Sequence, residues 1–235
     1  MSSLNIALIG GGPSIKGNEE SIRSLMPNCF SIGINYSYKY FKTDMQVAVD
    51  PEFISSHLPI LNSFPISVVR KYTCLKHLDM GNTIALPIAY THKDLGRIVT
   101  EGVYCHLLSG LFAMTLTLHL FLKLGRKGNI YMFGFDSKGV GKDAQGKELT
   151  HFYQGDGENH RGIGFVDFYN KANHHALWDV YSRDIKTLGI NVYNVSPQSA
   201  IENFKKIDYK ELPYITEPTG LDMGGVRKIF LGKDY

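Results

Sequence analysis

The segment Ile6–Lys16, with the sequence IALIGGGPSIK, decides the fold of this chain. A short apolar run stops at three consecutive glycines, and Pro13 and Ser14 follow. This order predicts a buried strand, a turn that carries no side chains, and a helix that begins nearby. Glycines let a main chain approach a ligand closely and adopt positive φ angles. Amides at the following helix N-terminus can face an anion such as phosphate. The segment therefore predicts a nucleotide-type site.

The spacing of these glycines fits neither of the two common phosphate-binding motifs. It is not GxGxxG, because the third glycine is Gly12 and Gly17 falls out of register. It is not a Walker A loop either, because no Gly-Lys-Ser/Thr follows. A tight strand-to-helix turn that binds no ligand is therefore the alternative interpretation, since such turns recur in α/β folds.

Strand candidates alternate with helix candidates along the rest of the chain. The strand candidates are Ile6–Ile9, Cys29–Asn35, Met45–Asp50, Ser67–Tyr72, Asn129–Phe135 and Asn191–Val195, and the helix candidates are Glu19–Met26, the segment from Ser109 to Leu124, and His174–Leu188. Apolar strands separated by helices indicate a mostly parallel sheet covered on both faces. We therefore expect an α/β fold with a single Rossmann-like domain over residues 1–209.

Polar or glycine residues follow several of these strands at the point where each strand ends. They are the turn Gly10–Ser14, Asn35, Asp50, Asp136 and Ser196. Because ligands bind at the carboxyl ends of parallel strands, we expect these residues to lie along one edge of the sheet. The pattern supports a ligand site that includes the glycine turn.

Two segments fall outside the alternation of strands and helices. Residues 137–173 are rich in glycine, charge and aromatic side chains, and a loop of this length in a compact domain is usually functional or disordered. The aromatic residues argue against disorder, so we expect a lid over the site. Residues 210–235 contain several prolines and glycines and are expected to form a C-terminal tail that wraps the surface or meets a partner subunit.

Composition excludes several classes of protein. The 235 residues are 43% hydrophobic, which is enough for a substantial core, and the formal net charge of +3 is small for a dedicated nucleic-acid binder. Three cysteines far apart in the sequence indicate reduced thiols rather than a zinc site or a disulfide framework. Neither a signal peptide nor a membrane span is expected, because the apolar runs are too short or are interrupted by polar residues. These observations predict a cytoplasmic location.

Three separated patches resemble one superfamily. They are LIGGGPSIK, the unit SGLFAMTLTLHLFLKLG with NIYMFGFD, and NVYNVSPQSAIENFKKIDY. The chain resembles the bacterial lipooligosaccharide sialyltransferases of glycosyltransferase family 42. It is also similar to the domain-of-unknown-function 115 group, which includes motility accessory factors and archaeal proteins similar to hydroxymethylpterin diphosphokinase.

The resemblance implies a site for a cytidine monophosphate donor. Carried over to this chain, it places Gly11, Gly12 and Ser14 at the turn, Asn35 after the second strand, and the pair Ser109–Gly110 at the start of the central helix. Asp50 stands where the family has an asparagine, and Gly11 replaces an asparagine that contacts the donor. Together with the strand-end pattern, the predicted nucleotide-binding residues are Gly10, Gly11, Gly12, Ser14, Asn35, Asp50, Ser109, Gly110, Asp136, Arg161 and Ser196.

A histidine that follows the lid is the catalytic base in the family. This chain offers His160, His174 and His175 in that region. Arg161, beside His160, could pair with a phosphate. The resemblance therefore implies a glycosyltransferase-like enzyme that moves a sugar from a nucleotide-activated donor to a glycan or another acceptor hydroxyl, with a histidine as general base. No Asp-x-Asp pair is present, which favours chemistry without a metal.

Two other functions stay open. Transfer of pyrophosphate from ATP to a small hydroxymethyl substrate would need Mg²⁺, held by Asp50 and Asp136 with the phosphates. A non-catalytic protein could instead use the same fold to hold a nucleotide or nucleic acid, with stacking on the basic and aromatic segment Tyr36–Lys42. A polynucleotide acceptor is a minority hypothesis because the charge excess is small. A homo-oligomer is expected from the resemblance and from the composition of the tail, residues 210–235.

Overall fold

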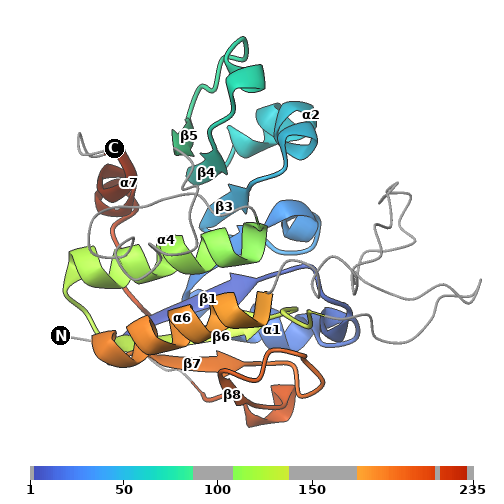
Figure 1. Ribbon diagram of the computed structural model, residues 1–235, viewed down its shortest axis with the longest axis vertical. Helices are drawn as coiled ribbons and strands as arrows, with labels where there is room; N and C mark the ends of the chain where they lie inside the picture. Colours follow the sequence, from blue (N-terminus) through green and yellow to red (C-terminus); the bar gives the residue numbers. More distant parts are fainter. Residues whose placement is uncertain (1–2, 87–107, 138–173, 215–217, 232–235) are drawn as a thin grey trace, which may run out of the picture.

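A computed structural model of the chain describes residues 3–86, 108–137, 174–214 and 218–231 (Figure 1). Within these residues the strands form one sheet of eight strands in the order β5-β4-β3-β2-β1-β6-β7-β8. All neighbouring strands are parallel. The strands are β1 (Leu4–Ile9), β2 (Phe30–Ile34), β3 (Met45–Ala48), β4 (Ile66–Arg70), β5 (Thr83–Leu86), β6 (Gly128–Phe133), β7 (Asn191–Asn194) and β8 (Lys205–Lys206). The predicted α/β class with a parallel sheet is confirmed.

Helices cover both faces of the sheet. They are α1 (Glu19–Leu25), α2 (Pro51–Leu61), α4 (Ser109–Leu124), α6 (His174–Leu188) and α7 (Met223–Leu231). Short 3-10 helices are η1 (Pro13–Ile15), η2 (Met26–Asn28), η3 (Asn35–Lys39), η4 (Thr73–Leu75) and η6 (Tyr209–Glu211). The main core includes residues of α4, α6 and α7 on one face of the sheet, whereas α1 and α2 pack in two smaller clusters on the other. In Figure 1, α4 and α6 cross in front of the sheet.

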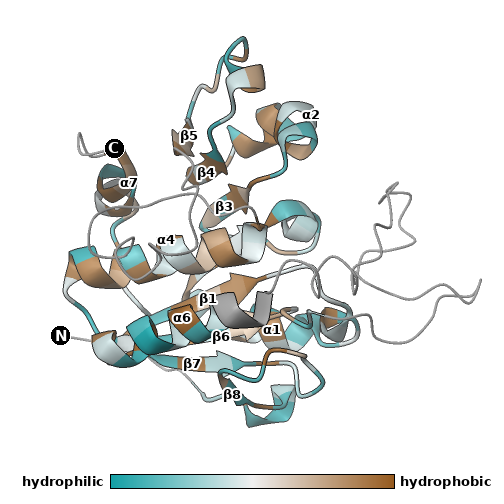
Figure 2. Cartoon of the chain, in the orientation of Figure 1, coloured by the Kyte–Doolittle hydropathy of each residue, from teal (hydrophilic) through white to brown (hydrophobic). Residues whose placement is uncertain are grey.

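The strands are apolar because both of their faces are covered. Every residue of β1 is buried, and β1 pairs with β2 on one side and β6 on the other. Ile6 is the partner of Phe30 in β2 and of Ile130 in β6. A strand with helices on both faces has no side that calls for polar residues, and Figure 2 shows the hydrophobic colouring of β1, β3 and β4.

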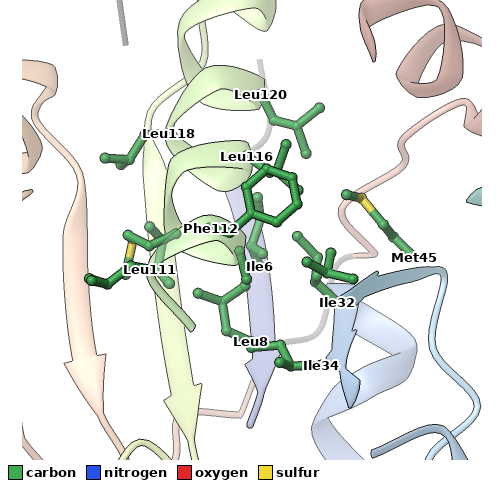
Figure 3. Packing of buried hydrophobic residues seen from close by; sticks show 14 of the residues in the cluster. Ile6, Leu8, Ile32, Ile34, Met45, Leu111, Phe112, Leu116, Leu118 and Leu120 are labelled. Carbon is green, nitrogen blue, oxygen red and sulfur yellow. The ribbon is translucent and has the colours of Figure 1, made fainter. Parts of the chain in front are cut away.

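The central helix α4 forms the middle of the main core. Every residue of Leu111–Phe121 is buried, which is the pattern of a helix that is covered all round. Figure 3 shows its leucines and Phe112 above Ile6 and Leu8 of β1 and Ile32 of β2. α4 ends at Gly125, whose φ of 60° is the left-handed conformation that glycine adopts without strain.

The structure adds elements that the sequence patterns did not indicate, among them β5, β8, α2 and α7. In the segment expected as a tail, Val226 and Phe230 of α7 are buried in the main core. Thr219 Oγ1 accepts a hydrogen bond from the Asn5 amide at 3.2 Å, which ties this segment to β1. Asn18 precedes α1, but its side chain does not cap the helix and donates instead to the Ser14 carbonyl oxygen at 3.0 Å.

His119 makes the stability of this core depend on pH. It is 1% exposed in α4, and its ring lies 6.1 Å from that of Phe230 in α7. Burial, together with the nearby charge of Lys123, lowers the pKa of His119 to about 4. In the unfolded chain the imidazole of His119 takes up a proton near pH 6.5. The contribution of the buried, neutral ring to the free energy of unfolding is therefore complete above that pH and is lost as the pH falls towards 4.

Between pH 6.5 and pH 5 this effect should cost about 2 kcal/mol of the free energy of unfolding. Urea unfolding of His119→Gln should therefore show a weaker loss over that range than the wild type. The matched control is His77→Gln, because His77 is exposed. Equal pH dependence in wild type and His119→Gln would contradict this assignment.

Candidate functional site

The glycine turn lies at the point where the order of the strands reverses. The chain proceeds outward from β1 through β2 to β5 and then returns to the other side of β1 with β6. In open α/β sheets, the carboxyl ends of the strands at such a reversal form a crevice in which ligands bind. The turn after β1 therefore stands between the ends of β2 and β6.

The amides of the turn make hydrogen bonds within the protein. Gly10 N donates to the Phe133 carbonyl oxygen at 2.8 Å, and Gly12 N donates to the Gly134 carbonyl oxygen at 2.8 Å. Ser14 N donates to Asp136 Oδ2 at 2.8 Å. Three of the amides expected to face a phosphate are thus already bonded to the end of β6. Gly11 lies between them and is half-buried.

Two of the three consecutive glycines are required by close packing against β6. A Cβ atom at Gly10 would lie 2.8 Å from the Gly134 carbonyl oxygen, and one at Gly12 would lie 2.5 Å from it. Gly134 itself has φ of 67°, a conformation that favours glycine. The alternative interpretation of the turn, as a structural feature, thus accounts for Gly10 and Gly12.

Asp136, which follows β6, is hydrogen-bonded both to the glycine turn and to the segment after β7. It is 1% exposed, and Oδ2 accepts from the Ser14 amide while Oδ1 accepts from the Ser196 hydroxyl. Its own carbonyl oxygen accepts from the Ala200 amide at 2.8 Å. The predicted residues Ser14, Asp136 and Ser196 are thus brought together, as a buried network that holds the ends of β1, β6 and β7. Burial raises the pKa of Tyr209, and the neighbouring Asp136 charge raises it further.

A second group of predicted residues meets at the N-terminus of α4. Ser109 Oγ donates to Asn35 Oδ1 at 3.2 Å. A Cβ atom at Gly110 would lie 3.1 Å from the Phe135 ring, so this glycine packs tightly at the end of β6. The N-cap residue of α4 is Leu108, whose apolar side chain makes no capping hydrogen bond. The first turn of α4 therefore brings its backbone amides and the positive end of its dipole to the carboxyl edge of the sheet.

Asn35 is held in an uncommon conformation. Its φ of 51° is left-handed, and its carbonyl oxygen accepts from Gln46 Nε2 at 2.6 Å. Ser137, after β6, has φ of 53°. Asparagine adopts this region more readily than most residues, and such conformations cluster at ligand sites. Asn35 directly follows β2 and Ser137 lies four residues beyond the end of β6, and these two strands flank β1.

Asp50 lies apart from both groups. It is exposed and caps α2, where Oδ1 accepts from the Phe53 amide at 2.9 Å. It follows β3, three strand positions from β6, which is a separation of about 14 Å between strand axes. A Mg²⁺ ion holds its ligand oxygens at about 2.1 Å. The structure therefore gives no support to one magnesium ion shared directly by Asp50 and Asp136.

Of the three predicted catalytic histidines, two lie within the described residues. His160 and Arg161 lie outside the described residues. His174 and His175 are the first two residues of α6. Because α6 ends directly before β7 begins, its N-terminus lies towards the carboxyl ends of the strands. The backbone of this pair is thus placed at the correct edge.

The structure also reveals an aromatic cluster that the sequence interpretation did not include. His57 in α2 stacks on Phe53 with ring centroids 4.3 Å apart, and Tyr36 meets both rings edge-on. His57 Nδ1 donates to the Phe53 carbonyl oxygen at 2.9 Å, which leaves Nε2 as the basic nitrogen of the neutral ring. Burial raises the pKa of Tyr36, and the charge of Asp50 raises it further. The sequence signal that we missed was Asp50-Pro51, an N-cap followed by proline at the first helical position, which marks the start of the helix α2 that carries Phe53 and His57.

The sheet order and the helices on both faces define a Rossmann-like α/β protein. No family model matches the sequence, and no curated protein matches it. Among solved structures, the chain is similar to one described as MAf glycosyltransferase from Magnetospirillum magneticum AMB-1, with a TM-score of 0.55 and 14% sequence identity. The match covers 98% of this chain and 37% of that one, so this chain spans little more than a third of its length. At this identity the likeness concerns the fold.

In the part of the chain that the structure describes, none of the helices has the length and hydrophobicity that a membrane crossing requires.

Proposed function

We propose that the chain is a glycosyltransferase-like enzyme that transfers a sugar from a nucleotide-activated donor, of the cytidine monophosphate type, to an acceptor hydroxyl. The observation that carries this proposal is the junction of Asn35, Ser109 and Gly110 at the reversal of the strand order. A helix N-terminus at this place suits the phosphate of a nucleotide. The fold that the chain shares with a glycosyltransferase adds support.

In this proposal the two groups of residues have different tasks. Asn35 and the first turn of α4 contact the donor, and α4 stabilises the negative charge on the departing phosphate. The network of Ser14, Asp136 and Ser196 holds the glycine turn in place. Gly11, Asp50 and Arg161 remain proposed contacts of the donor, and no metal is required.

The proposed base is a histidine at the start of α6 or in the segment before it. A base at this edge takes the proton of the acceptor hydroxyl as that oxygen attacks the sugar. We expect His174→Ala, His175→Ala or His160→Ala to lower turnover by about a hundredfold or more while nucleotide affinity is unchanged. Full activity in the triple variant would contradict a histidine base.

Thermal unfolding in the presence of nucleotides tests the proposal. Cytidine, uridine, guanosine and adenosine mono-, di- and triphosphates are compared, each with and without Mg²⁺. Cytidine monophosphate at a hundred times its Kd should raise the stability by about 2.7 kcal/mol. Ser109→Ala should weaken this response, whereas Ser24→Ala, at an exposed serine of α1, should not. Absence of any effect by cytidine or uridine nucleotides would contradict the proposal.

The other two functions are separate outcomes of the same measurement. Magnesium-dependent stabilisation by ATP, lost in Asp50→Asn, would favour pyrophosphoryl transfer instead. Nucleotide binding without consumption of any activated donor would favour a binding protein, for which the aromatic cluster of Tyr36, Tyr38 and Phe53 offers rings for stacking.

A further inference from the structure

Arg70 is a buried cation at the same edge of the sheet. It is the last residue of β4 and is only 8% exposed. Its Nε is fully buried without a hydrogen-bond partner. Within the part of the chain that the structure describes, no carboxylate forms an ion pair with its guanidinium. An arginine side chain this buried, with no acceptor for its Nε–H, is an uncommon arrangement.

A charge in this position costs free energy unless an anion compensates it. Removing a guanidinium from water is expensive, and proteins pair such groups with carboxylates or phosphates. The sequence around it offers no carboxylate, because residues 62–78 contain neither Asp nor Glu. Lys71 and Lys76 lie in the same stretch and are exposed. Asp50, after the neighbouring strand β3, caps α2 and forms no ion pair with Arg70.

The guanidinium is held in place by Tyr72. Its central carbon lies 4.6 Å from the centroid of the Tyr72 ring, which is the distance of a cation–π contact. Tyr72 Oη in turn donates to the Val49 carbonyl oxygen at 2.5 Å, beyond the end of β3. Arg70 is thus oriented at the carboxyl ends of β3 and β4, so a ligand there meets a fixed side chain.

We propose that Arg70 binds an anionic group of a substrate, a phosphate or a carboxylate, at the carboxyl ends of β3 and β4. The planar guanidinium forms paired hydrogen bonds with either group. β4 stands two positions from β2, a spacing of about 10 Å between strand axes, so this subsite is distinct from the junction at Asn35. The inference rests on the proposed function, because it adds a second recognition point to the same edge.

Thermal unfolding with inorganic phosphate, at constant ionic strength against chloride, tests this subsite. Phosphate at about ten times its Kd should raise the Tm of the wild type by about 2–5 °C. Arg70→Met keeps the aliphatic part of the side chain but removes the guanidinium, and with it the charge and the contact with Tyr72, so its response should fall. Lys71→Met is the matched control and should respond like the wild type. Without phosphate, Arg70→Met should be at least as stable as the wild type, because a costly charge is gone.

A wild type that shows no response to phosphate, or an Arg70→Met variant that responds fully, would overturn the proposal. If Arg70→Met does not fold, Arg70→Lys replaces it and should bind phosphate several-fold more weakly, because the paired geometry is lost. A direct measurement on the wild type is the NMR signal of the Arg70 Nε–H group, which should move as phosphate is added. An unmoved signal at saturating phosphate would also overturn the proposal.

Two further ligands identify the source of the anionic group. If Arg70→Met weakens binding of cytidine monophosphate, the group belongs to the donor. If it weakens binding of glucuronate and leaves cytidine monophosphate unchanged, the group belongs to an acidic acceptor. Stabilisation by cytidine monophosphate, with no effect of Arg70→Met on the binding of either cytidine monophosphate or glucuronate, would overturn this subsite and leave the proposed function standing.

Discussion

Asp136→Ala is expected to lose about 2–5 kcal/mol of the free energy of unfolding, because two buried donors lose their acceptor. The Ser14 amide and the Ser196 hydroxyl both bond to this carboxylate, which is 1% exposed. Nucleotide binding should fall as well, because the glycine turn loses its support.

Chemical denaturation and nucleotide titration measure the two effects. Asp136→Asn keeps the shape but places an amide N–H₂ where an acceptor is needed, so it should lose about 1–3 kcal/mol. Asp50→Asn is the control of identical chemistry, and it should be nearly neutral because asparagine caps a helix as well as aspartate does. If Asp136→Asn proves as stable as Asp50→Asn, the assignment of Asp136 as a structural junction is wrong.

Gly12→Ala should have an effect of similar size for a different reason. A Cβ atom there would lie 2.5 Å from the Gly134 carbonyl oxygen, so the turn must move away from β6. That movement breaks the hydrogen bond from Gly12 N to the same oxygen and disturbs the one from Ser14 N. We expect a loss of about 2–4 kcal/mol, as for other substitutions that overfill a packed site.

Gly224→Ala is the matched control for this substitution. Its Cβ atom would lie 3.5 Å from Asp222 Oδ1, which is ordinary contact, and the position is helical. Alanine should therefore leave stability unchanged or raise it by up to about 1 kcal/mol. Gly12→Ala with the stability of Gly224→Ala, measured by urea unfolding, would show that the turn is not packed as described.

The strands of the sheet were predicted well, because the sequence pattern that indicates a strand is local. Apolar runs bounded by polar residues correspond to a strand near each predicted range, and His174–Leu188 and the helix that ends before Gly125 lie where the structure has them. β8 was missed because it has only two residues, both lysine. α2 was missed because Asp50 was interpreted as a ligand contact, although it also matches a helix cap.

The site was harder to predict, because its interactions join residues far apart in the chain. The rule that polar residues follow parallel strands correctly gathered Ser14, Asp136 and Ser196. It did not show that the Ser14 amide and the Ser196 hydroxyl bond to Asp136 rather than to a phosphate. Arg70 escaped notice because nothing in a sequence distinguishes a paired arginine from one without a partner.

A crystal structure of the protein with cytidine monophosphate tests the central claim most directly. The account predicts the phosphate at the N-terminus of α4, within hydrogen-bond distance of the amides of Ser109 or Gly110, with the nucleoside beside Asn35. A nucleotide bound at another place, or none at this junction in crystals grown at concentrations that saturate the protein in solution, would contradict it.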